Sequence, residues 1–121
     1  MYYWIVGPPA SGKSTLASQF EMIGYANWDG DKLRKMLSPD LGWSKIDVIK
    51  HHERIIEQLS FDKQFHKKIV VTTCAPYPEV RHMIQKVAQL VVMDTPIEVC
   101  KERDFKGIYD RFEITTCHTQ S

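Results

Sequence analysis

Residues Gly7–Thr15 read "GPPASGKST", and this motif is the strongest indication of the fold. Its spacing is G-x-x-x-x-G-K-[ST], in which successive backbone N–H groups point at phosphate oxygens, the lysine reaches the outer phosphates and the next hydroxyl binds Mg²⁺. The apolar run Tyr2–Val6 before it is typical of a buried strand, and the residues from Ser14 to Phe20 are expected to open a helix. A helix N-terminus adds the positive end of its dipole to such a site. This context favours a phosphate-binding loop over a turn that only joins a strand to a helix.

The loop and the first helical turn after it are expected to form the nucleotide site. Gly7 and Gly12 are expected to adopt backbone angles that side chains would forbid. The spacing assigns Lys13 to the outer phosphates and Ser14 to the metal ion. The predicted cofactors are ATP or GTP with Mg²⁺, and the residues predicted to hold them are Gly7, Ala10, Ser11, Gly12, Lys13, Ser14 and Thr15.

Length and composition predict one domain over residues 1–121, because 121 residues with 43% hydrophobic content suffice for a single core. Sixteen Lys plus Arg against fifteen Asp plus Glu give a net charge of +1, so no overall field favours nucleic acid. No apolar run is long enough to span a membrane, and no charged leader precedes the first strand. The three cysteines, Cys74, Cys100 and Cys117, lack paired spacing. We therefore expect a cytoplasmic protein without membrane contact or zinc.

Apolar runs alternate with helical patterns along the chain. Strands are expected at "YYWIV", "YANW", "KIVVTT" and "QLVVM", and helices over residues 14 to about 22, 32–37, 44 to about 65, 78–87 and 96–103. Near-continuous apolar strands between helices predict an α/β fold of three layers, a small parallel sheet flanked by helices, with ligands at the carboxyl ends of the strands. In the long helix His52 shares a face with Ile49 and Ile56, so we expect a packed histidine rather than a ligand.

The segment "NWDGDKLRKML" places Asp29 and Asp31 directly after a short strand, with Arg34 three residues further on. A phosphotransferase needs a carboxylate at the acceptor hydroxyl, Mg²⁺ beside the β- and γ-phosphates and a cation that steadies the acceptor. Asp-Gly-Asp also forms ordinary turns and helix caps. The position after a phosphate loop favours the catalytic interpretation, in which the two carboxylates serve the metal and the acceptor hydroxyl, and Lys13 and Arg34 are the catalytic cations.

Three segments, "GPPASGKST", "WDGDKLRKMLSPDLGWS" and "VVMDTPIEVCKERDFKGIYD", resemble the successive signatures of the adenylyl-sulfate kinase family, in order from Trp4 to about Asp110. The resemblance implies a P-loop kinase fold and ATP- and Mg²⁺-dependent phosphorylation of the 3′-hydroxyl of adenylyl sulfate. It places Asp29 at the metal and Asp31, the favoured base, at the acceptor hydroxyl. It also implies that residues of four later segments contact the ligands. Arg34 would bind the acceptor and Trp43 would stack on its base, Pro76 and Tyr77 would line the substrate site, and Arg103, Lys106 and Gly107 would border the ATP adenine.

The chain departs from that family in the long helix and at its end. Where the family reads D-R-x-E-N-I-R-R, residues 47–54 read "DVIKHHER", so two arginines become Val48 and Glu53 and the asparagine becomes His51. In the family these groups grip the sulfate and phosphate end of the acceptor, and their loss removes anion contacts. After Tyr109 the family's lid is cut short, and its last strand and last helix are absent, so we expect a fold truncated at the C-terminus.

Three functions remain open from the sequence. The first is a kinase that phosphorylates a hydroxyl of a nucleotide-like or other small molecule. The second is a polynucleotide or nucleoside 5′-hydroxyl kinase, which shares a P-loop followed by Asp-x-x-Arg, here Asp31 and Arg34; the near-neutral charge counts against nucleic acid as a partner. The third is a nucleotide-binding regulator with weak catalysis, which the short lid favours. A homodimer is an open alternative, because a missing last strand would leave a sheet edge uncovered.

Overall fold

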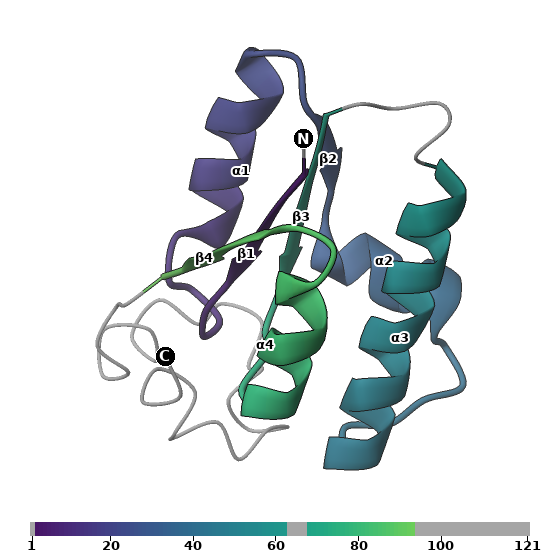
Figure 1. The fold of residues 1–121 in the computed structure, drawn as a ribbon. Coiled ribbons are helices and arrows are strands. Elements are labelled where there is room, and N and C mark those ends of the chain that lie inside the picture. The colour runs from purple at the N-terminus through teal and green to yellow at the C-terminus, as the bar shows by residue number, and fades with distance from the viewer. Residues whose placement is uncertain (1, 63–67, 94–121) are drawn as a thin grey trace.

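The computed structural model describes residues 2–62 and 68–93 (Figure 1). Strands and helices follow one another in the predicted order within these ranges, with two consecutive helices after the second strand. In chain order they are β1 (Tyr2–Val6), α1 (Lys13–Met22), β2 (Ala26–Trp28), α2 (Gly30–Leu37), α3 (Lys45–Asp62), β3 (Ile69–Thr73), α4 (Pro78–Gln85) and β4 (Gln89–Val92). The helix expected over 96–103 and the predicted adenine contacts Arg103, Lys106 and Gly107 lie outside the described residues.

The four strands form one parallel sheet in the order β2-β3-β1-β4. Helix α1 covers one face, and α2, α3 and α4 cover the other (Figure 1). This confirms the predicted three-layer α/β fold. Because the strands are parallel, β1, β2 and β3 end at the same edge, and the segments that follow them meet there.

Strands β1, β3 and β4 send alternate side chains into two apolar clusters, one on each face of the sheet. On the α1 face the buried residues are Ile5, Ala17, Tyr25 and Val70. On the opposite face they are Trp4, Val6, Leu33, Val48, Ile55, Leu59, Ile69, Val71, Ala75, Val80 and Ile84. Burial on both faces explains why the strand sequences are almost continuously apolar.

A buried polar network joins β1, β3 and α3. The indole N–H of Trp4 donates to Thr73 Oγ1 at 2.9 Å, and Thr73 Oγ1 lies 2.9 Å from His52 Nε2. His52 Nδ1 lies 2.8 Å from the carbonyl oxygen of Val48. A carbonyl only accepts, so Nδ1 carries the proton and Nε2 accepts from the Thr73 hydroxyl. His52 is therefore a packed core residue, which confirms the prediction.

The neighbouring His51 is also buried, and its Nδ1 lies 2.6 Å from Ser38 Oγ. Burial disfavours the imidazolium form of both rings. It lowers the pKa of His51 to about 3 and that of His52 to about 4. Both histidines are neutral at physiological pH, so the hydrogen bonds that they make from α3 are uncharged.

Three helix starts differ from the predictions by one or two residues. Helix α1 begins at Lys13 and α2 at Gly30, both earlier than expected. Helix α3 begins at Lys45, one residue later than expected, and Ser44 caps it, since the Asp47 N–H donates to Ser44 Oγ at 3.2 Å. The Asp47 carboxylate accepts from the Gly42 N–H at 2.9 Å and so ties the preceding loop to the helix. No helix within residues 2–62 and 68–93 is both long and apolar enough to cross a membrane.

Candidate active site

The phosphate loop leads from β1 into α1, and its backbone has the shape that the motif requires. Ala10 and Gly12 have φ angles of 64° and 96°, in the left-handed region. Gly12 is the N-cap of α1, and neither a side-chain cap nor an acidic residue in the first turn occupies that helix end. The N-terminal N–H groups of α1 are thus oriented to bind an anion, and this end of the helix fits a phosphate group.

Gly7 is required for a different reason from the one predicted. The positive-φ glycines in the described ranges are Gly12 and Gly24, so the expectation of a special backbone angle at Gly7 is wrong. A Cβ at Gly7 would instead lie 2.8 Å from the Cβ of Met93 and 2.9 Å from Ser11 Oγ. The Met93 N–H donates to the Val6 carbonyl at 2.8 Å, which holds the end of β4 against the loop. Gly7 therefore allows a close approach of two segments.

Lys13 lies along the loop that precedes it. Its Nζ donates to the carbonyl oxygens of Gly7 at 2.8 Å and Pro8 at 2.9 Å. These contacts bring the ammonium group back over the loop at the carboxyl edge of the sheet. Ser14 and Thr15 follow in the first turn of α1 and are exposed. The loop therefore offers a cation, backbone donors and hydroxyls to a triphosphate.

The turn Asp29-Gly30-Asp31 lies at the same edge, because β2 ends at Trp28. Asp29 is the N-cap of α2, but its side chain makes no capping hydrogen bond to that helix. One strand, β3, separates β2 from β1, so the turn and the phosphate loop are two strand spacings apart, about 10 Å. Asp29 and Asp31 are thus carried on the same edge as the expected γ-phosphate.

Ser14 and Asp29 were the predicted metal ligands. In residues 2–62 and 68–93 no three His, Cys, Asp or Glu side chains gather as a metal site. Mg²⁺ in phosphoryl-transfer sites takes one or two protein ligands and completes its coordination with phosphates and water. A hydroxyl at the start of α1 and a carboxylate after β2 fit that requirement.

Arg34 and Trp43, which the sequence placed separately on the acceptor, contact each other. The Arg34 guanidinium lies 4.2 Å from the centre of the Trp43 ring. Its Nη2 donates to the carbonyl oxygens of Leu41, at 3.3 Å, and Gly42. Burial lowers the pKa of Arg34, and the nearby Asp47 carboxylate opposes that shift. The two side chains form one stacked unit on the loop between α2 and α3, with Trp43 38% exposed.

The other cations around this loop are paired. Arg54 donates to both carboxylate oxygens of Asp40, at 2.7 and 3.0 Å, and to the Leu37 carbonyl at 2.8 Å. These hydrogen bonds lower the pKa of Asp40 to about 2. Lys45 forms an ion pair with Glu79. The sequence did not predict the pairing of Arg54 with Asp40, because the two residues lie fourteen positions apart, one on a helix and one on a loop.

The positions that depart from the family pattern in α3 face two directions. Val48 is 3% exposed and His51 is 5% exposed, and both pack toward α2 and the sheet. Glu53 is exposed. The helix therefore presents an acidic group, and no cation, at the two positions where arginines were expected.

Pro76 and Tyr77 follow β3 at the same edge of the sheet. Pro76 is buried, and Tyr77 is half-buried as the N-cap of α4. Lys45 Nζ lies 5.3 Å from the centre of the Tyr77 ring. This contact brings the start of α3, just after Trp43, close to the segment after β3.

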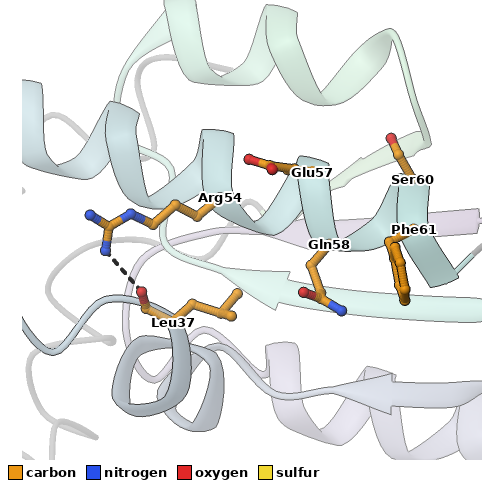
Figure 2. A pocket seen from close by; sticks show the side chains of 6 residues that line it. All are labelled: Leu37, Arg54, Glu57, Gln58, Ser60 and Phe61. Carbon is orange, nitrogen blue, oxygen red and sulfur yellow. Dashed lines mark hydrogen bonds between the residues drawn. The ribbon is translucent and has the colours of Figure 1, made fainter.

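A pocket also opens between the end of α2 and α3, away from these residues (Figure 2). Figure 2 shows the hydrogen bond from Arg54 to the Leu37 carbonyl at one side of it. None of the predicted site residues lines it; its lining residues are Leu37, Arg54, Glu57, Gln58, Ser60 and Phe61. It is separate from the candidate site.

Comparison with known proteins agrees with this geometry. The sequence model of the family described as Adenylylsulphate kinase matches residues 1–116. The adenylyl-sulfate kinase of Clostridium acetobutylicum is 36% identical over 118 residues, which cover 89% of this chain and 59% of that protein. The bifunctional enzyme NodQ of Rhizobium sp. (strain N33) is 32% identical over 90% of this chain and 19% of its own length. The chain thus spans less than two thirds of the length of each of these relatives.

A solved structure of the Mycobacterium tuberculosis APS kinase CysC, in complex with AMPPNP and APS, superposes with a TM-score of 0.74. The two proteins are 30% identical, and the match covers 90% of this chain and 70% of that one. Sequence and structure therefore agree with the motifs, and the chain belongs to the adenylyl-sulfate kinase family of P-loop kinases.

Proposed function

We propose that the chain is an ATP- and Mg²⁺-dependent kinase that transfers the γ-phosphoryl group to a hydroxyl of a nucleotide-like acceptor, with adenylyl sulfate as the first candidate. The observation that carries this proposal is the shared edge of the sheet. The phosphate loop after β1 and the Asp29-Gly30-Asp31 turn after β2 flank the end of β3. Such an edge can bring a triphosphate and an acceptor hydroxyl together, and phosphoryl transfer is achieved largely by positioning and charge stabilisation.

Each group has a distinct task in this reaction. The N–H groups at the start of α1 and the Lys13 ammonium bind the phosphate oxygens and offset their charge. Ser14 and Asp29 would hold Mg²⁺, which would supply further neutralisation of the triphosphate's negative charge. The acceptor oxygen forms a bond to the γ-phosphorus while the bond to the ADP oxygen breaks. Asp31 accepts the proton that leaves the acceptor hydroxyl.

Arg34 and Trp43 are proposed to hold the acceptor. The Trp43 ring is partly exposed beside the Arg34 guanidinium, and such a pair suits a planar base next to an anionic group. The relative from Mycobacterium tuberculosis was solved with APS, which supports adenylyl sulfate as the acceptor to test first.

A second acceptor class is favoured by α3. Val48 and Glu53 stand where the family pattern has arginines, so the side chains of this helix offer less positive charge to a sulfate. An adenine nucleotide without the sulfate group would lose less by that change. A nucleoside monophosphate is therefore the alternative acceptor within the same reaction.

The test is transfer of labelled γ-phosphate from ATP, with GTP in parallel, to a panel of acceptors. The panel contains adenylyl sulfate, nucleoside monophosphates, nucleosides and a 5′-hydroxyl oligonucleotide. Lys13→Ala and Asp31→Asn should each abolish transfer, whereas Lys35→Ala, an exposed position on α2, should not. Label on the oligonucleotide would favour a polynucleotide kinase. ATP binding without label on any acceptor would refute the proposal and favour a nucleotide-binding regulator.

A further inference from the structure

Two adjacent threonines end β3, the strand between the phosphate-loop strand and the strand that carries the aspartates. Thr72 and Thr73 are both buried, at 4% and 6% exposure. Because consecutive strand residues face opposite sides of a sheet, their hydroxyls have different partners. Thr73 belongs to the network with Trp4 and His52. Thr72 Oγ1 instead accepts a hydrogen bond from the Gly30 N–H at 3.3 Å.

This hydrogen bond satisfies one of the donors that every helix N-terminus leaves without an intrahelical partner. The side chain of the N-cap residue commonly meets that need. In α2 the N-cap Asp29 has an extended backbone and makes no side-chain capping bond, while its carbonyl accepts from the Leu33 N–H at 3.0 Å. The cap comes from another strand, so the Asp29 carboxylate is not used to hold its own helix.

The contact leaves no room for a side chain at Gly30. A Cβ there would overlap the Thr72 carbonyl oxygen and lie 3.4 Å from the Thr73 Cα. The start of α2 is thus pressed against the backbone of β3. Since β3 pairs directly with β1, with Ile5 opposite Thr72, this contact links the aspartate turn to the strand that carries the phosphate loop.

We propose that Thr72 is a positioning residue, whose hydroxyl holds the Gly30 N–H and thereby sets Asp29 and Asp31 relative to the phosphate loop. Its catalytic consequence rests on the proposed function, but the contact itself does not. Without the hydroxyl, the Gly30 N–H loses its hydrogen-bond acceptor, although the glycine itself is unchanged. The carboxylates then sample more positions, and both metal-dependent nucleotide binding and transfer become less efficient.

The chain offers a matched set of variants. Thr72→Val removes the hydroxyl and keeps the branched shape, whereas Thr72→Ser keeps the hydroxyl. Thr73→Val makes the same change one residue later, on the opposite face, and should lower stability through the Trp4 and His52 network. Should Thr72→Val fail to fold, Thr72→Ala removes the same hydroxyl with a smaller side chain.

Three quantities are measured on the full chain: the amide exchange rate of Gly30 by NMR, the Mg²⁺ concentration that half-saturates ATP binding, and kcat for transfer. In Thr72→Val we expect Gly30 exchange to rise and kcat to fall, each by about tenfold, as for the loss of one hydrogen bond. The Mg²⁺ requirement should rise as well. Thr72→Ser should restore all three, and Thr73→Val should change none of them.

The proposal is overturned if Gly30 exchange is the same in Thr72→Val and the wild type. It is also overturned if exchange rises while the Mg²⁺ requirement and kcat stay at wild-type values. If the wild type binds ATP but transfers no phosphoryl group, the proposed kinase function fails. Gly30 exchange and the Mg²⁺ requirement then decide the role of Thr72 by themselves.

Discussion

The guanidinium of Arg34 lies 4.2 Å from the centre of the Trp43 ring, while its Nη2 donates to the Leu41 and Gly42 carbonyls of the same loop. One arginine therefore fixes both the path of the loop and the orientation of its aromatic residue. Asp47 adds a second tie, since its carboxylate accepts from the Gly42 N–H. These contacts hold Arg34 and Trp43, the proposed acceptor platform, in place without help from an acceptor.

Arg34→Lys should weaken acceptor binding, because an ammonium lacks the planar face with which the guanidinium lies over the Trp43 ring. We expect the KM for adenylyl sulfate to rise about tenfold, with an unchanged KM for ATP. Steady-state kinetics against each substrate checks this. The same substitution at Arg54, whose partners are Asp40 and Leu37, should lower the melting temperature and affect the acceptor KM less. Equal effects of the two changes on KM would argue against the platform.

Gly12 and Gly24 form a matched pair for the phosphate loop. Both have left-handed backbones, with φ of 96° and 99°. Alanine at either position should cost about 1–2 kcal/mol of unfolding free energy from backbone strain. Only Gly12→Ala should weaken ATP binding, because Gly24 follows the other end of α1. Urea unfolding and calorimetric ATP titration measure the two effects, and an equal loss of ATP affinity in Gly24→Ala would contradict the assignment.

The two buried histidines predict acid lability. Their pKa values in the folded chain, about 3 for His51 and about 4 for His52, lie below the unfolded value of about 6.5. Below pH 6.5 the unfolded chain therefore binds protons that the folded chain does not. Each histidine makes stability fall by about 1.4 kcal/mol per pH unit until its folded pKa is reached.

His52→Gln should make the unfolding free energy less sensitive to pH between about 6 and 4, relative to the wild type. Urea titrations at several pH values would show it as a shallower slope, even if the variant is less stable at pH 7.5. Gln19→Ala, at an exposed position on α1 with no titratable group, serves as the control, and it should leave the slope unchanged. Identical slopes for the wild type and His52→Gln would mean that His52 is not held neutral by burial.

Glu53→Arg tests the proposed loss of anion contacts in α3. Glu53 is exposed, so an arginine there is tolerated, whereas an arginine at the buried Val48 would place a charge in the core. We expect Glu53→Arg to lower the KM for adenylyl sulfate by about tenfold at low salt and by less at high salt. Glu57→Arg, one turn later on the same helix, makes the same charge change and should leave that KM unaltered. A lowered KM for both would indicate a general charge effect.

Most of the fold was predictable because local patterns determine it. The apolar strand runs, the phosphate-loop motif and the cap at Ser44 all act over a few residues. The roles of two glycines could not be predicted in this way. Gly7 and Gly30 are required by close approaches to Met93 and Thr72, which lie far along the chain, and no local pattern encodes those distances.

The sequence predicted which residues belong to the candidate site, but not how they contact one another. Its expected members Asp29, Asp31 and Lys13 lie on segments at one edge of the sheet, as the parallel topology requires. The stacking of Arg34 on Trp43 and the cap from Thr72 depend on the path of a loop and on strand order. Neither contact follows from a periodic pattern in the sequence.

The central claim is phosphoryl transfer to an acceptor hydroxyl, and ³¹P NMR of the chain with ATP, Mg²⁺ and adenylyl sulfate tests it most directly. We predict a new phosphomonoester signal that grows in step with ADP and is absent with Asp31→Asn. ADP formed together with inorganic phosphate alone, or at the same rate in the wild type and Asp31→Asn, would contradict the account.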